Sequence, residues 1–249
     1  KVYKLTVSGF ALNYATPVGL MGGEPYRIME LTPYVGASKA TSSVILYVMM
    51  HIFSHFCFWF FSIFLYLALR PVDIAMGTIL AVVGAVSLLA IYFFMKGYKN
   101  GMAVRTLKLL QHIPFIKEWA KRFSENKREA LERVDSQIAE LHKQRRSTFY
   151  ASLSLEFMAR IIGCLEVYFI LNILTTDVSF PACILIMAFT SLFANLFFFS
   201  PMQLGAREGG FALAVGGLAI PGAFGVYTGL ITRVRELIWI VIGVLLRSE

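Results

Sequence analysis

The sequence predicts an all-α, polytopic membrane protein, and its composition and two long uncharged segments carry this prediction. Of the 249 residues, 57% are hydrophobic. With glycine counted and tyrosine omitted, the apolar share is about 60%, against roughly 45 to 50% in soluble domains. Val44–Leu69 and Ile74–Met95 run for 26 and 22 residues without a formal charge, and ~20 residues are enough to cross a bilayer. Residues 70–73 between them fit only a tight turn, so we expect a transmembrane helical hairpin.

Three further apolar segments follow, at residues 149–173, 181–199 and 224–246. Each is predicted to be long enough to cross as a helix. Residues 201–220 leave two topologies open, because they either cross the membrane or enter it and return. The chain begins at Lys1 without a methionine, so we expect N-terminal helices to precede it. Residues 1–249 are expected to form one transmembrane domain.

The connector at residues 96–147 carries most of the basic charge. It holds 13 of the 23 lysines and arginines and six acids, which leaves seven of the chain's eight net positive charges there. Basic loops beside transmembrane helices stay in the cytoplasm, so we expect a cytoplasmic connector in an inner (plasma) membrane protein. A basic stripe also suits nucleic acid, but topology and attraction to anionic lipid explain it, and no nucleic-acid partner is expected.

Apolar residues recur at helical spacing within this connector. Val104, Leu107 and Leu110 precede Pro114, and a second set begins at Leu131. This pattern predicts two amphipathic helices at the inner surface. We favour capping of the helical bundle as their role, with binding of a partner as the alternative, since amphipathic helices mostly serve packing. Whether the chain forms a homo-oligomer is left open.

Two glycine-rich elements near the ends of the chain share a proline–glutamate pattern. In the first, Glu24 follows Pro17 by seven residues, and in the second, Glu208 follows Pro201 by the same interval. Broken, charged elements repeated in both halves of a membrane protein point to a central binding site in transporter-like folds. We expect broken or re-entrant helices there, and an inverted repeat would bring both glutamates to one cavity. The residues expected to break the helices are Pro17, Gly22, Gly23, Pro201, Gly205 and Gly209.

Ionisable side chains stand in or beside the apolar segments, although a charge at mid-bilayer costs about 2.5 to 3.5 kcal/mol. The local pairs at helical spacing are Glu24 with Arg27, Glu156 with Arg160, and Arg233 with Glu236. The charges are either buried ion pairs that fix helix register or the lining of a hydrated cavity for a polar headgroup, where arginine would bind phosphate. We favour the cavity, because Arg27 and Arg207 lie within the broken elements. The candidate headgroup-binding residues are Glu24, Arg27, Arg160, Arg207, Glu208, Arg233 and Glu236.

No cofactor or metal site is expected. His51 and His55 lie four residues apart on one helix face, a spacing that can bind metal, but no glutamate stands between them and no third ligand is nearby. We interpret them as polar lining or as helix–helix hydrogen-bonding groups. No catalytic serine–histidine–acid set is visible in the sequence either.

Several short motifs keep a characteristic order and spacing. They are Asn13–Pro17, Gly22–Glu24 with Arg27, Ser38–Thr41, Ser200–Pro201, Gly205, Glu208–Gly209 and Arg233. In this order they resemble the lysylphosphatidylglycerol synthase transmembrane family, the flippase-like membrane domain of the bacterial multiple peptide resistance factor. The resemblance covers nearly the whole chain. It implies a polytopic domain with broken or re-entrant helices that moves lipids or lipid-linked molecules between leaflets.

The sequence also departs from that family. The soluble aminoacyl-transferring domain of the two-part members is absent from it, so the resemblance implies no lysyl transfer from transfer RNA. The first helix or two expected of the family are also absent, and Arg207 and Arg235 have no assigned place in the family pattern.

Two classes of function therefore compete. The first is a translocase that moves a phospholipid or lipid-linked molecule through a charge-lined cavity without chemistry of its own. The second is a membrane-embedded transferase acting on a phospholipid or polyprenyl phosphate, with a glutamate as general base. The sequence shows no aspartate-rich metal motif, which favours transport. A scaffold subunit with a vestigial cavity is a third alternative.

Overall fold

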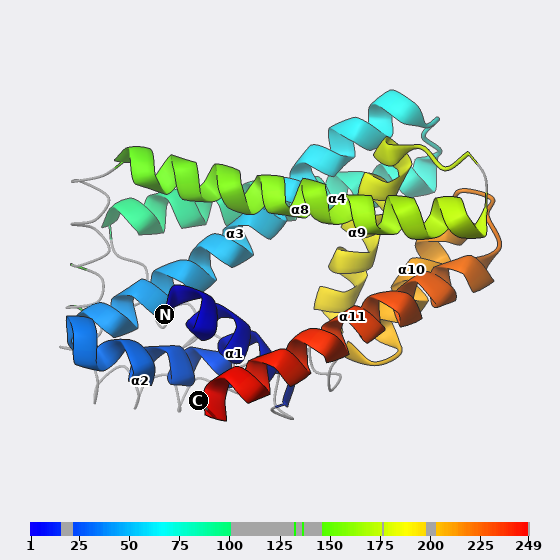
Figure 1. The fold of residues 1–249 in the computed structure, drawn as a ribbon. Helices are drawn as coiled ribbons and strands as arrows, with labels where there is room; N and C mark the ends of the chain where they lie inside the picture. Colours follow the sequence, from blue (N-terminus) through cyan, green and yellow to red (C-terminus); the bar gives the residue numbers. More distant parts are fainter. Residues whose placement is uncertain are drawn as a thin grey trace. The chain divides into compact units, whose positions relative to one another are not determined.

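The computed structural model describes residues 1–15, 22–100, 132, 136, 146–175, 177–197 and 203–248. Within these ranges the regular elements are eight α-helices (Figure 1), as the predicted all-α fold requires. They are α1 (Val2–Ala15), α2 (Gly23–Val35), α3 (Ala37–Leu69), α4 (Ile74–Asn100), α8 (Arg146–Leu174), α9 (Phe180–Leu196), α10 (Ala206–Gly216) and α11 (Gly222–Ser248). Pro17, Pro201 and nearly all of the connector at 96–147, with its predicted amphipathic helices, lie outside the described residues.

The chain divides into two compact units that share several long helices. The first unit comprises Lys1–Arg27, Phe58–Gly84 and Met158–Glu249. The second comprises Ile28–Cys57 and Ala85–Phe157. The boundaries fall inside α2, α3, α4 and α8, so each of these helices contributes to both units.

The predicted hairpin is confirmed by α3 and α4, which are separated only by the short break before Ile74. α3 begins at Ala37, seven residues before the predicted start, because the chain restarts a helix directly after Gly36. Gly36 has a φ of +81°, a left-handed conformation that glycine adopts without steric cost. The N–H of Gly36 closes α2 on the carbonyl of Thr32 at 2.9 Å.

Three of the predicted spans are long, apolar helices in the structure. Within the described residues, three helices are long and apolar enough to cross a membrane: Ala37–Leu69, Ile74–Lys96 and Ser147–Leu174. In the segment predicted at 181–199, the described helix is α9 with 17 residues, which at 1.5 Å per residue extends about 26 Å, near the lower limit for crossing the hydrocarbon core. α11 has 27 residues, but Arg233, Arg235 and Glu236 interrupt its apolar surface.

Residues 201–220, for which two topologies were left open, contain the helix α10. α10 has 11 residues and extends only about 16 Å, so it does not cross a bilayer as one helix. It packs against both α9 and α11. The path of residues 201–220 relative to the membrane stays a prediction.

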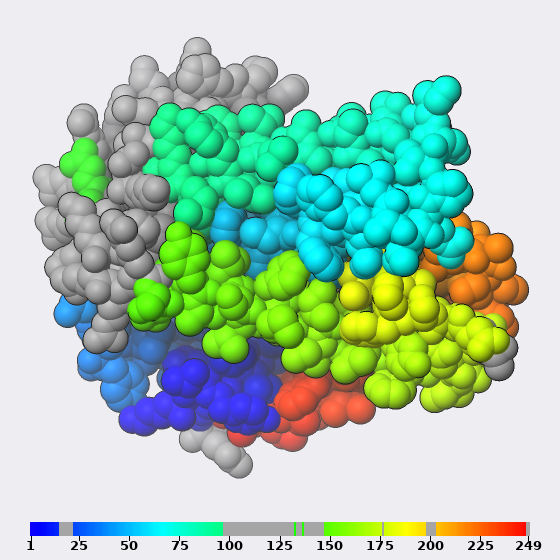
Figure 2. All heavy atoms as spheres, turned by 90° about the horizontal axis from the view of Figure 1, so that it is seen from above, coloured from blue at the N-terminus to red at the C-terminus, as the bar shows by residue number. Residues whose placement is uncertain are grey.

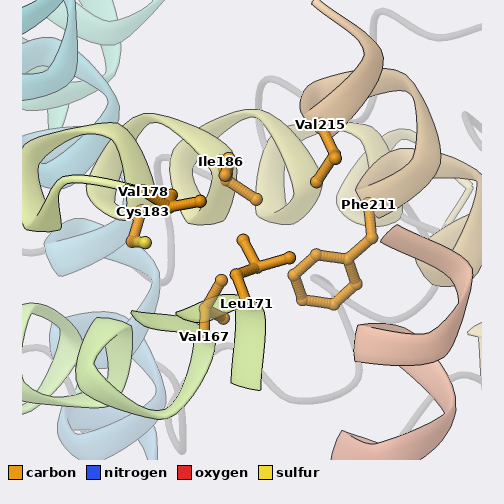
Figure 3. Packing of buried hydrophobic residues seen from close by; sticks show 7 residues of the cluster. All are labelled: Val167, Leu171, Val178, Cys183, Ile186, Phe211 and Val215. Atoms are coloured by element: carbon orange, nitrogen blue, oxygen red, sulfur yellow. The ribbon is translucent and has the colours of Figure 1, made fainter. Parts of the chain in front are cut away.

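The core of the first unit joins α8, α9 and α10. Its seven buried members point toward one another in Figure 3. They are Val167, Leu171, Val178, Cys183, Ile186, Phe211 and Val215. Asn172 fixes the turn between α8 and α9, because its side-chain amide donates to the carbonyl of Val178 at 3.0 Å and accepts from the N–H of Val178 at 3.2 Å. This core sets the position of α10, which carries Glu208.

Small residues let α1 and α10 approach α11 closely. A Cβ at Gly225 would lie 2.5 Å from the carbonyl oxygen of Phe211, and a Cβ at Gly243 would lie 2.5 Å from that of Val7. Ser8 Oγ donates to the carbonyl of Gly243 at 2.9 Å. Both α1 and α10 consequently lie along α11 (Figure 1), and the contact of α1 with the C-terminal part of α11 is also visible in Figure 2.

The second unit has its own aromatic core. Met50, Phe53, Phe94 and Phe149 are buried together. The rings of Phe53 and Phe94 stack with centroids 4.1 Å apart. This cluster joins the first half of α3 to the second half of α4 and the start of α8.

Candidate functional site

The first proline–glutamate element places Glu24 in the first turn of α2. Asn13 Nδ2 donates to Glu24 Oε1 at 3.1 Å, and Arg27 Nη1 donates to the same oxygen at 3.2 Å. The predicted local pair of Glu24 with Arg27 is therefore confirmed. Asn13 Oδ1 also accepts from the backbone N–H of Gly23 at 2.7 Å. One side chain of α1 thus caps α2 and orients its glutamate.

Arg27 packs against α1. The residue is 9% exposed, and a Cβ at Gly9 would stand 2.5 Å from Arg27 Nε. Glycine at position 9 therefore leaves the space that the guanidinium fills. Gly23 is equally close to α1, since a Cβ there would overlap the carbonyl oxygen of Gly9.

The second element places Glu208 in the first turn of α10. Its Oε2 accepts from the N–H of Gly205 at 2.9 Å, so the glutamate caps its own helix. Its Oε1 accepts from Arg233 Nε of α11. Arg233 Nη2 also donates to the carbonyl of Gln203 at 3.1 Å. Arg233 therefore holds both the glutamate and the loop that leads into α10.

A second cross-helix pair stands beside the first. Arg207, next to Glu208 on α10, donates to Glu236 Oε1 on α11. Local spacing predicts a pair between Arg233 and Glu236, but the structure pairs each of them with α10. The two ion pairs run in antiparallel order, so they fix the register between the helices as well as their contact.

Arg235 extends the network to α8. Its Nη1 donates to Glu166 Oε2 at 2.6 Å, and its Nη2 lies 3.9 Å from Glu236 Oε1. Glu236 is 5% exposed, and its Oε2 is buried without a hydrogen-bond partner among the described residues. The hydroxyl of Tyr14 on α1 also hydrogen-bonds to the Glu236 side chain.

The last turn of α1 reaches both elements. Asn13 contacts Glu24, as described above, while the adjacent Tyr14 interacts electrostatically with Glu236, Arg207 and Arg233. α1 therefore links the first element to the ion-pair network of the second. The expectation that Glu24 and Glu208 approach one cavity stays a prediction.

A cavity of about 220 Å³ opens beside the network. Its charged lining comes from α8, α10 and α11, and its hydroxyl groups come from α9 and α11. The polar and charged residues that line it are Arg160, Glu166, Ser191, Arg207, Thr232 and Arg235. Three arginines against one glutamate give the lining a formal charge of two positive, or one positive if the adjoining Glu236 is included. Such a space can attract an anion of phosphate size.

Arg160 is one of the cavity-lining residues, as the headgroup hypothesis requires. Its pairing with Glu156 or with another carboxylate stays a prediction. In the second unit, Glu156 Oε2 lies 3.3 Å from His51 Nδ1, and the rings of His51 and His55 meet edge to face with centroids 5.2 Å apart. Among the described residues, no three histidine, cysteine, aspartate or glutamate side chains are grouped to hold a metal ion.

Of the residues predicted to break helices, Gly22 and Gly205 lie between helices, Gly23 and Gly209 lie in the first turns of α2 and α10, and Pro17 and Pro201 lie outside the described residues. α1 ends before Gly22 and α2 begins at Gly23, while α9 ends before Gly205 and α10 begins after it. Gly209 lies inside the first turn of α10, where a Cβ would meet nothing closer than 4.0 Å. Each broken end already has a protein acceptor for one N–H, from Asn13 in α2 and from Glu208 in α10. The anion-attracting groups are therefore the arginines of the cavity.

Sequence reasoning missed the glycines that position Glu208. Gly225 and Gly229 form a Gly-xxx-Gly pair on α11, a motif that allows close helix packing. A Cβ at Gly229 would lie 3.1 Å from Glu208 Cγ. Arg233 stands one turn further along the same face. The regular spacing of these three residues is a signal in the sequence that could have identified α11 as the source of the partner of Glu208.

The chain was compared with known protein families, curated proteins and solved structures. A sequence model of the lysylphosphatidylglycerol synthase transmembrane region matches residues 1–243. No curated protein and no solved structure matches the chain. The match covers both proline–glutamate elements, the ion-pair network and the cavity. The chain belongs to the lysylphosphatidylglycerol synthase transmembrane family.

Proposed function

We propose that the protein moves a phosphate-bearing membrane lipid between leaflets, with the lipid headgroup passing through the arginine-lined cavity. The observation that carries this proposal is the cavity of about 220 Å³ with three arginines and one glutamate in its lining. Two of these arginines, Arg207 and Arg235, are held by carboxylates. Guanidinium groups around an open space can exchange such a carboxylate for an anionic ligand.

The groups around the cavity suit a phosphate that carries hydroxyls. Arginine forks from α8, α10 and α11 can donate several hydrogen bonds to phosphate oxygens. Ser191 and Thr232 add hydroxyl groups.

The paired glutamates have a separate task in this proposal. Glu236 on α11 neutralises Arg207 of α10, and Glu208 on α10 neutralises Arg233 of α11. Both glutamates therefore keep the charged elements stable in an apolar setting. Movement of a headgroup would exchange some of these contacts for contacts with phosphate. Arginine can exchange carboxylate for phosphate because both anions match its planar fork.

We further propose an inner (plasma) membrane location with the connector at residues 96–147 in the cytoplasm. The support is the basic charge of the connector, which follows the positive-inside tendency. The partners in this proposal are membrane lipids, and it requires no nucleic acid, metal or cofactor.

The decisive experiment fills the cavity without removing any charge. Gly163 lines the cavity on α8, and a Cβ there would meet nothing within 4 Å. Gly163→Leu is therefore expected to fold and to block headgroup entry. Gly216→Leu on α10 is the matched control, because a Cβ at Gly216 is equally free and the residue does not line the cavity.

The measurement is transbilayer movement of labelled phosphatidylglycerol in liposomes that contain purified protein. The parent and Gly216→Leu are expected to accelerate exposure of the label to the outer medium, and Gly163→Leu is expected to do so far less. Equal rates for Gly163→Leu and the parent would refute the cavity as the path. Covalent change of the lipid would support the transferase, and no effect of the parent on any lipid would favour the scaffold.

A charge-specific series complements the filling variant. Glu24→Gln and Glu208→Gln nearly preserve side-chain volume, so a purely packing role predicts little loss of movement. We expect reduced movement by the protein that purifies folded; because each variant removes one partner of an ion pair, its thermal unfolding is measured in parallel. Glu30→Gln makes the same chemical change at an exposed position of α2 and is expected to behave like the parent.

A further inference from the structure

A second hollow in the first unit has the opposite chemistry. It is an apolar groove of about 200 Å³ formed by α3, α4, α9 and α10. Its lining is almost entirely hydrocarbon and includes Trp59, Ile79, Leu192, Leu213 and Gly217. None of the lining residues that the structure describes is charged. The arginine-lined cavity and this apolar groove are therefore separate spaces with complementary preferences.

The two spaces share a wall made by α3 and α9. On α9, Met187 and Ser191 face the cavity, whereas Ile186 and Leu192 line the groove. On α3, two consecutive residues line different spaces: Phe58 lines the cavity and Trp59 lines the groove.

One hydrogen bond joins the two linings. Trp59 Nε1 donates to Ser191 Oγ at 2.9 Å. Trp59 belongs to the groove and Ser191 to the cavity, so this bond marks the boundary between apolar and charged surroundings. Tryptophan suits such a place because its ring is apolar and its N–H is a polar donor.

We propose that the groove holds a hydrocarbon chain of the same lipid whose phosphate enters the cavity, with the Trp59–Ser191 contact at the junction of chain and headgroup. This inference rests on the proposed function and names the substrate class more closely as an amphipathic anionic lipid. A soluble phosphate compound would use the cavity and leave the groove without a role.

Size and chemistry support a chain as the occupant. An apolar cavity of roughly 150 Å³ is enough to bind benzene, so about 200 Å³ accommodates a segment of a hydrocarbon chain. Covalent linkage of phosphate and chain in one molecule explains why a positively charged cavity and an uncharged groove lie on either side of one side-chain contact. An apolar protein segment would have no such reason to lie beside three arginines.

Tryptophan fluorescence can test this placement directly. The chain has three tryptophans, so Trp119→Phe with Trp239→Phe leaves Trp59 as the only tryptophan. Bromine on a lipid chain quenches a nearby indole. The protein is reconstituted into unlabelled phosphatidylcholine bilayers with increasing fractions of brominated phosphatidylglycerol, and a parallel series uses brominated phosphatidylcholine.

We expect quenching by brominated phosphatidylglycerol to saturate at a low fraction, as binding to a site requires. Quenching by brominated phosphatidylcholine is expected to rise in proportion to its fraction, as contact with bulk lipid requires. Gly217→Leu should lose the saturable part because its side chain enters the groove. Gly217 has helical backbone angles, φ −63° and ψ −13°, so leucine is tolerated there, and Gly216→Leu is the neighbouring control that should keep the saturable part.

A second pair of variants guards against a folding defect. Ile79→Phe enlarges a groove residue of α4 that is already exposed, and Val82→Phe makes a similar change at an exposed position outside the groove. Loss of saturable quenching in Ile79→Phe but not in Val82→Phe would support the chain site. Identical, non-saturating curves for both lipids, or unchanged quenching in both groove variants, would overturn it.

Failure of this inference and failure of the proposed function have different outcomes. Saturable quenching without lipid movement by the parent would mean that the lipid binds but is not translocated. Lipid movement that is unaffected by Gly217→Leu, together with non-saturating quenching, would leave the translocase standing and remove the chain site.

Discussion

The two proline–glutamate elements share a sequence pattern but stabilise their glutamates differently. Glu24 has its arginine on the same helix, three residues away, and α2 is capped by Asn13 of α1. Glu208 caps its own helix through Gly205, and its arginine comes from α11, 25 residues away. In the first element the ion pair is local and the helix cap comes from another helix. In the second element the cap is local and the ion pair joins two helices.

This difference explains where the cavity lies. A local pair such as Glu24 with Arg27 is complete within one helix, and Arg27 fills a space left by Gly9. The second element exchanges charges between α10 and α11, and Arg235 carries the network to α8. An open, positively charged space forms only where several helices contribute arginines. The proposed binding of a lipid headgroup therefore depends mainly on the second element.

The largest expected effect comes from breaking the cross-helix pair. Arg233→Met leaves Glu208 buried without its cation, and loss of one partner of a buried pair costs about 3 to 5 kcal/mol. Arg27→Met should cost less, because Glu24 is more exposed than Glu208, at 27% against 15%, and keeps its bond to Asn13. The stability of both variants is measured by heating them in detergent and recording the fraction of protein that remains monodisperse.

The control for this comparison is the double variant Arg233→Met with Glu208→Gln, which removes both charges. It should recover much of the lost stability, because replacing both members of a buried pair is often nearly neutral. Equal losses for Arg27→Met and Arg233→Met would mean that the two pairs are equivalent and would remove the distinction between the elements.

The next effect concerns close packing. Gly23→Ala places a methyl group on the carbonyl oxygen of Gly9, and overpacking of this kind costs about 1 to 3 kcal/mol. Gly209→Ala, in the other element, meets no atom nearer than 4.0 Å and should be neutral or slightly stabilising. A reversed order of melting temperatures would contradict the assigned packing of α2 against α1.

Gly205 tests backbone conformation instead of space. A Cβ at Gly205 would meet nothing within 4 Å, but its φ is +79°. Alanine there should therefore cost about 1 to 2 kcal/mol through left-handed strain alone. Gly216→Ala, at an unobstructed helical position, should cause no loss. Unchanged stability of Gly205→Ala would show that the entry to α10 can adopt another conformation.

The smallest expected effect is at the cap of α2. Asn13→Ala removes the acceptor for the N–H of Gly23 and one donor to Glu24, and loss of a helix N-cap costs typically ~1 kcal/mol. Asn195→Ala removes an exposed amide that bonds within its own helix and should change stability by less than about 0.5 kcal/mol. Stability of Asn13→Ala equal to that of Asn195→Ala would mean that α2 does not depend on α1 for its cap.

Much of the fold could be predicted because it depends on local sequence. The hairpin at Val44–Leu69 and Ile74–Met95 and both helix breaks follow from apolar length and from glycine. The pair of Glu24 with Arg27 follows from helical spacing. The span predicted at 181–199 stays a prediction, because hydrophobicity marks an apolar segment but does not fix where its helix ends.

The sequence by itself determined that this is an α-helical membrane protein with two broken, charged elements. Only the tertiary structure decided which charges meet. Arg207 with Glu236, Arg233 with Glu208 and Arg235 with Glu166 all join different helices, and helical spacing carries no information about such partners. The close approach of α10 to α11 at Gly225 and Gly229 brings those charges together and leaves the cavity between the arginines, because packing between helices, unlike the pattern along one helix, depends on the whole fold.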